Sequence, residues 1–125
     1  MENIRQGERI LIISDYQNIR EFVYLELKYM NFEVEDVDSG LADELLKNKE
    51  YGLLIIDNDL YGYKGTELLK CFRNNGCQTP AVILTNGELR DDVLKTDDNI
   101  AGIILKSGDE NFIKLLKKTV EGVLK

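Results

Sequence analysis

Four polar side chains, Asp15, Asp57, Thr85 and Lys106, stand at the ends of short apolar runs of the chain. Each run is too short for a helix and lacks alternation, which is typical of a strand covered on both faces. If these strands are parallel, their carboxyl ends share one edge of a sheet, where two carboxylates, a hydroxyl and an ammonium meet. That set of groups predicts chemistry on phosphate and magnesium.

The two carboxylates need a partner at such an edge. Asp15 and Asp57 would repel each other there unless a cation joined them. We expect Mg²⁺, which prefers oxygen ligands and, when bound by one or two carboxylates, keeps waters that phosphate oxygens can replace. Asp57 could then act as a nucleophile, as in other aspartyl-phosphate chemistry. Thr85 and Lys106 would hydrogen-bond and neutralise the phosphoryl oxygens.

Each residue also has a structural interpretation. Asp15 could equally cap the helix that follows it, and Thr85 could cap the helix after its strand. Lys106 could be a solvated strand end. A helix cap or a solvated strand end explains Asp57 least well. The next helix begins several residues later, and the four large apolar residues before Asp57 place its carboxylate where it would be partly buried. The functional interpretation therefore depends on convergence of all four residues.

The elements that must position these residues alternate between strand and helix patterns. Strands are predicted over residues 9–13, 32–37, 53–56, 81–84 and 100–105, and helices over about 17–30, 41–49, 66–74, 88–95 and 111–124. The second strand alternates apolar and acidic residues, which favours a sheet edge, while the third is the most apolar and should be central. This order predicts an α/β fold, a doubly wound five-stranded parallel sheet in the order 2-1-3-4-5, flavodoxin-like (βα)5.

Composition limits the class of protein. A chain of 125 residues with 43% hydrophobic content predicts one domain over residues 1–125. The net charge of −7 argues against direct binding to nucleic acid or a membrane surface. No apolar run approaches a span of about 20 residues, and the first residues lack a signal-peptide pattern, so a cytoplasmic location is expected. Without histidine, the two cysteines form no zinc-site spacing.

Longer segments resemble the receiver domains of bacterial two-component response regulators, including the single-domain chemotaxis regulators. The segment ILIISDYQNIR at 10–20 resembles the first strand and acidic turn of that family. The segment LLIIDNDLYGYKGTELL at 53–69 resembles its phosphoacceptor strand, loop and third helix. PAVILT at 80–85 and IILK at 103–106 resemble its last two strands, so the resemblance covers nearly the whole chain.

The resemblance implies a signalling switch rather than an enzyme, with at most slow self-dephosphorylation. Asp57 would accept a phosphoryl group from the phosphohistidine of a histidine kinase or phosphotransfer protein. Asp15, Asp57 and the backbone carbonyl of Asp59 would ligate Mg²⁺, Thr85 would move toward the phosphoryl oxygens and Lys106 would pair with them. A downstream protein would read the surface of the fourth helix, fifth strand and fifth helix, and a homodimer is compatible with this arrangement.

The chain departs from the family pattern at several positions. Ser14 stands where the family usually has an acidic residue, Asn86 replaces a small residue, Ile103 replaces an aromatic residue and Ser107 replaces a proline. Ser14 should weaken metal binding, while Asp59 adds a carboxylate near the acceptor. The departures leave open a phosphorylation-independent interaction module. A magnesium-dependent phosphohydrolase is a third hypothesis, although Gln17 stands where its second acid is expected. Tyr61 and Tyr63 could form a partner-binding lip or simply cover a helix end.

Overall fold

The computed structural model describes residues 8–87, 89 and 97–124. Its strands are β1 (Arg9–Ile13), β2 (Glu33–Val37), β3 (Leu53–Asp57), β4 (Ala81–Thr85) and β5 (Ile100–Leu105). Its helices are α1 (Gln17–Lys28), α2 (Ser39–Asn48), α3 (Gly65–Asn74) and α5 (Glu110–Leu124). The helix predicted at 88–95 falls largely outside the described residues.

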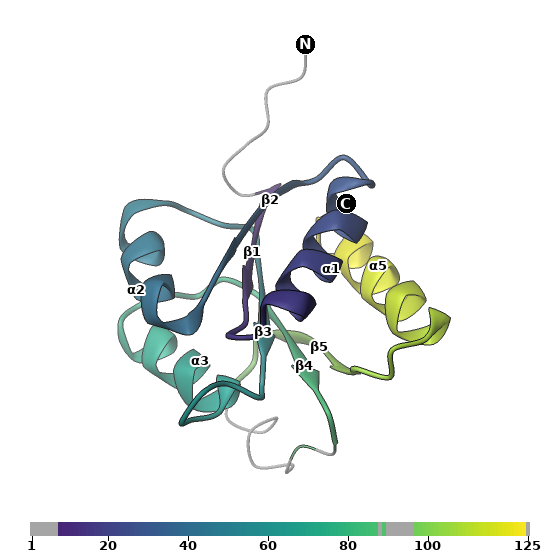
Figure 1. Ribbon diagram of the computed structural model, residues 1–125. Helices are drawn as coiled ribbons and strands as arrows, with labels where there is room; N and C mark the ends of the chain where they lie inside the picture. The colour runs from purple at the N-terminus through teal and green to yellow at the C-terminus, as the bar shows by residue number, and fades with distance from the viewer. Residues whose placement is uncertain (1–7, 88, 90–96, 125) are drawn as a thin grey trace.

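The strands form one parallel sheet in the order β2-β1-β3-β4-β5, which confirms the predicted topology. The alternating strand β2 lies at the edge, and every residue of the apolar strand β3 is buried at the centre. Along the chain, β2 is added on one side of β1, and β3 is then added on the opposite side of β1. The switch point therefore lies between the carboxyl ends of β1 and β3, at the lower side of Figure 1.

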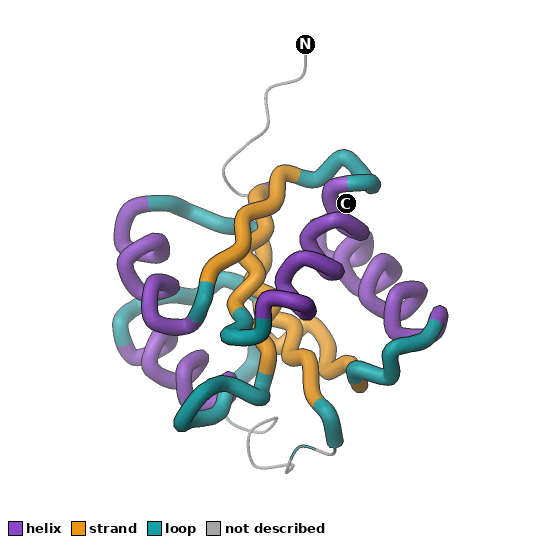
Figure 2. The backbone as a smooth tube through the Cα atoms, in the orientation of Figure 1, coloured by secondary structure: helices purple, strands orange, loops and turns teal. Residues whose placement is uncertain are grey.

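Helices cover both faces of the sheet, with α1 and α5 on one face and α2 and α3 on the other (Figures 1 and 2). Alternate residues of the central strands supply the two cores. Ile10 and Ile12 pack into the core under α1 and α5, whereas Leu11 and Ile13 pack into the core under α2 and α3. Burial on both faces explains why the central strands β1, β3 and β4 are continuously apolar. Within the described ranges, no helix is long and apolar enough to cross a membrane.

The first helix ends two residues earlier than its apolar spacing predicts. Asn31 adopts a left-handed conformation with a φ of 67°, which asparagine tolerates better than most residues. The amide of Met30 donates to the carbonyl of Leu27 in a tightened last turn. This left-handed residue redirects the chain from α1 into β2, so the boundary is set by the turn rather than by the apolar pattern.

Arg73 joins the end of α3 to the segment that enters β5. Its Nε lies 2.9 Å from Asp97 Oδ2, and its other nitrogens donate to the carbonyls of Cys77, Thr79 and Asn99. Burial would raise the pKa of Asp97, but hydrogen bonds from Arg73 and the Asn99 amide hold it below the ordinary value. The planar guanidinium therefore connects three loop carbonyls and one carboxylate.

Arg73→Lys should lower the free energy of unfolding by about 2 kcal/mol at pH 7, because one ammonium cannot reproduce the fork of donors. Since the folded-state pKa of Asp97 is depressed, its ionised form stabilises the fold above about pH 3.9 and that contribution is lost as pH falls through the folded value. Urea unfolding at pH 7 and pH 3 should show the difference between the proteins shrinking in acid. An equal difference at both pH values would contradict this role for the ion pair.

Candidate functional site

Asp57 is the last residue of the central strand and its side chain is fully buried. Its Oδ1 accepts hydrogen bonds from Lys106 Nζ at 2.7 Å and from the Asp59 amide at 3.0 Å. Its Oδ2 accepts from Ser14 Oγ at 2.9 Å. A buried carboxylate is tolerated only when such donors replace water. The predicted acceptor therefore lies in a formed polar site.

Lys106 reaches this site because the β4–β5 ladder continues one residue past the strand. Its amide donates to the carbonyl of Thr85 at 2.8 Å, which fixes the backbone at the carboxyl edge. Its Nζ lies 2.7 Å from Asp57 Oδ1 and 3.0 Å from Asp59 Oδ2, and its side chain is only 7% exposed. Burial lowers the pKa of Lys106, but the two carboxylates raise it above the ordinary value. The ammonium is therefore held charged between two acids.

Ser14 is a member of the site that sequence reasoning treated only as a lost acid. It is 1% exposed, and its hydroxyl donates to Asp57 Oδ2 while accepting from the Tyr16 amide at 3.1 Å. The available signal was its position directly after β1, the parallel neighbour of β3. Where the family pattern has a charged acid, Ser14 thus supplies a hydrogen-bond donor to the Asp57 carboxylate.

Asp15 lies at the predicted edge, but its interpretation as a helix cap is wrong. The N-cap of α1 is Tyr16, and that cap has no side-chain hydrogen bond from the described residues. Asp15 instead accepts from the amide and hydroxyl of Ser39, at 2.8 and 2.9 Å, and from the Tyr61 amide at 2.8 Å. Burial raises the pKa of Asp15, but these hydrogen bonds hold it below the ordinary value. The Asp15 carboxylate therefore connects the segment before α1 to the start of α2 and to the β3–α3 loop.

Thr85 ends β4 at the same edge and is 6% exposed. Its hydroxyl donates to the Gly87 carbonyl at 2.8 Å and accepts from the Gly87 amide at 3.2 Å. The hydroxyl of Thr85 is thus occupied in a local turn. Thr85 lies on the strand next to that of Asp57, and the two side chains form no hydrogen bond among the described residues. Its predicted movement toward a phosphoryl group stays a prediction.

The β3–α3 loop is held by a second residue that the sequence did not single out. Asn58 is 6% exposed, and its Oδ1 accepts from the Thr66 amide at 3.2 Å at the start of α3. Its backbone carbonyl accepts from the Gly65 amide at 3.0 Å. These two bonds close the β3–α3 loop, which carries Asp59 and Tyr61.

The carboxylates at this edge of the sheet have the chemistry of a magnesium site. Asp15 and Asp57 supply the carboxylate oxygens that the ion prefers, although the described residues contain no cluster of three acids arranged as a metal site. Asp57 Oδ2 and Asp15 Oδ1 each accept one hydrogen bond from the described residues, so each keeps acceptor capacity. The two carboxylates therefore fit the ion chemically.

The chain is similar to known proteins over most of its length. The family model of the response regulator receiver domain matches residues 10–118. Response regulator ArlR of Staphylococcus saprophyticus is 32% identical over 96 residues, which cover 76% of this chain and 40% of that protein. The chain thus spans less than half the length of this curated relative.

Solved structures show the same fold. The chemotaxis protein CheY4 of Vibrio cholerae has a TM-score of 0.77 and 24% identity, with 93% of this chain and 98% of that chain covered. A chain in the crystal structure of histidine kinase ThkA in complex with response regulator protein TrrA has a TM-score of 0.73 and 25% identity, covering 90% and 97%. With the family match spanning most of its length, the chain belongs to the response regulator receiver domains of two-component signalling.

Proposed function

We propose that this domain is a phosphoacceptor switch that receives a phosphoryl group on Asp57 from the phosphohistidine of a histidine kinase or phosphotransfer protein. The observation that carries the proposal is the buried Asp57 carboxylate, held 2.7 Å from the Lys106 ammonium at the switch point of the sheet. The similar chain found in a structure of histidine kinase ThkA with TrrA supports a kinase as the donor.

In the proposed transfer, an Asp57 oxygen forms a bond to phosphorus while the phosphorus–nitrogen bond breaks, and the imidazole leaves with the electron pair and gains a proton. Lys106 would shift from the carboxylate to the new phosphoryl oxygens and neutralise part of their charge. Ser14 would keep the carboxylate oriented through its hydroxyl. Thr85 would exchange its bond to Gly87 for one to a phosphoryl oxygen.

Magnesium, held by Asp15, Asp57 and the carbonyl of Asp59, would offset the negative charge that gathers on the phosphoryl oxygens. The loss of an acid at position 14 predicts weak binding of the ion. The extra carboxylate of Asp59 partly restores the negative charge of the cleft, although Lys106 already lies 3.0 Å from it.

The output of the switch would be a changed protein-binding surface around β5 and α5. Residues 1–125 would act as one receiver unit in the cytoplasm, with no direct contact to nucleic acid or membrane, because the net charge of −7 disfavours both. We propose no catalytic turnover beyond slow loss of the phosphoryl group. A homodimer through this surface is compatible with the proposal.

The test is labelling by acetyl phosphate, read by intact mass with and without Mg²⁺. Wild type and the control Asp43→Asn should gain one phosphoryl group in the presence of Mg²⁺, and Asp57→Asn should gain none. Asp43 is a matched control because its side chain is 50% exposed and pairs with Lys47 on the same helix. Labelling that persists in Asp57→Asn would move the acceptor elsewhere.

The remaining outcomes separate the rival hypotheses. Labelling of wild type without Mg²⁺ would keep Asp57 as the acceptor and remove the metal from the proposal. No labelling of wild type, while a known receiver domain is labelled in parallel, would favour the phosphorylation-independent interaction module. Turnover of a phosphate ester that Asp57→Asn abolishes would favour a phosphohydrolase.

A further inference from the structure

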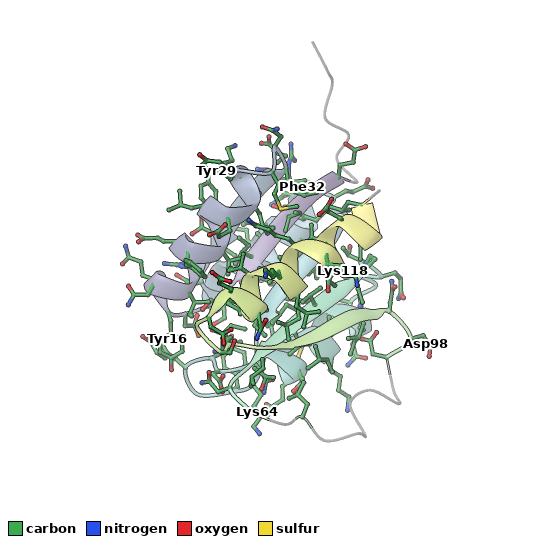
Figure 3. The ribbon with its side chains drawn as sticks, turned by 90° about the vertical axis from the view of Figure 1, so that its right-hand side faces the viewer. Tyr16, Tyr29, Phe32, Lys64, Asp98 and Lys118 are labelled. Atoms are coloured by element: carbon green, nitrogen blue, oxygen red, sulfur yellow. The ribbon has the colours of Figure 1, made fainter. Side chains whose placement is uncertain are left out.

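Two tyrosine rings meet on the loops that surround Asp57. Tyr16 directly follows the acidic turn after β1, and Tyr61 lies in the β3–α3 loop. Their ring centroids are 5.0 Å apart and their planes are inclined by 76°, an edge-to-face contact. Figure 3 shows Tyr16 at the lower end of the molecule, where Lys64 of the β3–α3 loop also lies, whereas Tyr29 lies at the upper end.

The backbone of each tyrosine is bonded to a residue of the site. The Tyr16 amide donates to Ser14 Oγ at 3.1 Å, and the same hydroxyl donates to Asp57 Oδ2. The Tyr61 amide donates to Asp15 Oδ2 at 2.8 Å. Neither bond involves a tyrosine side chain. The rings are therefore positioned relative to the acceptor carboxylate by backbone contacts that a side-chain substitution leaves in place.

The rings remain largely open to solvent. Tyr16 is 40% exposed and Tyr61 is 64% exposed, although they contact each other. In an edge-to-face pair, one ring directs its edge at the other, so aromatic surface remains available to a third ring. A cap over a helix end would bury this surface. Exposed aromatic surface on the loops that follow β1 and β3 instead favours contact with a molecule that approaches this edge of the sheet.

The donor named by the proposed function supplies a third ring. When phosphorus reaches an Asp57 oxygen, the imidazole nitrogen bonded to phosphorus lies on the opposite side of the phosphoryl group, toward the outside of the buried site. We propose that the Tyr16–Tyr61 pair binds the imidazole ring of the phosphodonor and thereby favours phosphoryl–nitrogen donors with an aromatic ring over acyl phosphates. This inference rests on the proposed function and names the donor class that the site prefers.

The experiment compares two small donors, monophosphoimidazole and acetyl phosphate, on wild type and on a Tyr16→Leu/Tyr61→Leu double variant. Leucine keeps apolar bulk and the backbone amides but removes the aromatic faces. The ratio of the phosphorylation rate constants, imidazole donor over acetyl donor, should fall by about three- to tenfold in the double variant, the range expected for one aromatic contact. Intact mass against time gives both rates.

Two controls make the result specific. Tyr29→Leu removes a more exposed ring, 91% accessible, at the far end of α1 and should leave the ratio unchanged. Tyr16→Phe/Tyr61→Phe keeps the rings and should also retain the ratio, which still tests the inference if the leucine variant fails to fold. An unchanged ratio in the leucine variant, or a lowered ratio in the phenylalanine variant, would overturn recognition by the rings.

The failure of the proposed function is a different result. Absence of labelling from both donors in wild type would overturn the phosphoacceptor proposal and the ring contact with it. If both donors label wild type and the rate constants for both fall equally in the leucine variant, Asp57 remains the acceptor and the tyrosines have only a structural role.

Discussion

Gly65→Ala is expected to lower the free energy of unfolding by about 3 kcal/mol or more, because the first residue of α3 has no room for a methyl group. A Cβ built on Gly65 would lie 2.3 Å from the Asp57 carbonyl oxygen, 2.8 Å from Ile56 Cγ2 and 2.9 Å from Asn58 Cα. Two of these three neighbours are backbone atoms of the strand end and loop, so the clash cannot be relieved by rotating a flexible side chain.

Urea unfolding followed by circular dichroism measures this effect, with Gly122→Ala as the matched control. Gly122 is also helical, and apart from its chain neighbours and the backbone of its own helix, no atom of the described residues lies within 4 Å of a Cβ built there. Alanine at that position should stabilise the protein by up to about 1 kcal/mol through helix propensity. A Gly65→Ala protein within about 0.5 kcal/mol of wild type would show that the strand end is not packed as described.

Lys106→Met is expected to cost about 3 to 5 kcal/mol of unfolding free energy, because it leaves the fully buried Asp57 carboxylate without its counter-charge. Methionine approximates the length of the aliphatic part of lysine and lacks the ammonium. The remaining donors to Asp57 are the Ser14 hydroxyl and the Asp59 amide, and the nearby Asp59 carboxylate would then be repulsive. Chemical denaturation at neutral pH measures the loss.

A double-mutant cycle identifies the cause. Lys106→Met/Asp57→Asn should recover much of the stability, since the second change removes the uncompensated charge. Lys114→Met is the control for loss of a lysine in general, because Lys114 is 76% exposed and its Nζ is 3.9 Å from Glu110. That control should change stability by no more than about 0.5 kcal/mol. Additive losses in the double variant would contradict a direct charge pair.

The order of the central strands was predictable because apolarity reports burial there, whereas the expectation that β5 is covered on both faces was wrong, since β5 lies at the sheet edge and only Ile104 is buried. The alternation in β2 indicated an edge, the continuous apolar run of β3 indicated the centre, and the structure has both. The convergence of Asp57 and Lys106 followed from parallel order alone, since both residues lie at carboxyl ends of strands in the same sheet. Those inferences needed only periodicity and topology.

Side-chain direction was not predictable in the same way. Asp15 was placed correctly at the edge, but its hydrogen bonds reach Ser39 and Tyr61, which are 24 and 46 residues away in the sequence. The hydroxyl of Ser14 bonds to a residue 43 positions later. Such contacts depend on rotamers and on how two loops approach each other, and neither is encoded in the period of a single segment.

The hydrogen bonds of Asp15 affect how variants of this residue should be interpreted. One carboxylate joins three stretches of chain, so Asp15→Asn would disturb loop anchoring and the proposed magnesium ligand in the same protein. Ser39→Ala removes the hydroxyl donor at 2.9 Å and leaves the carboxylate ionised, so it isolates the mechanical contribution from the electrostatic one. Mutational analysis of this cleft should therefore begin with Ser39→Ala, because a loss of function in Asp15→Asn would combine two causes.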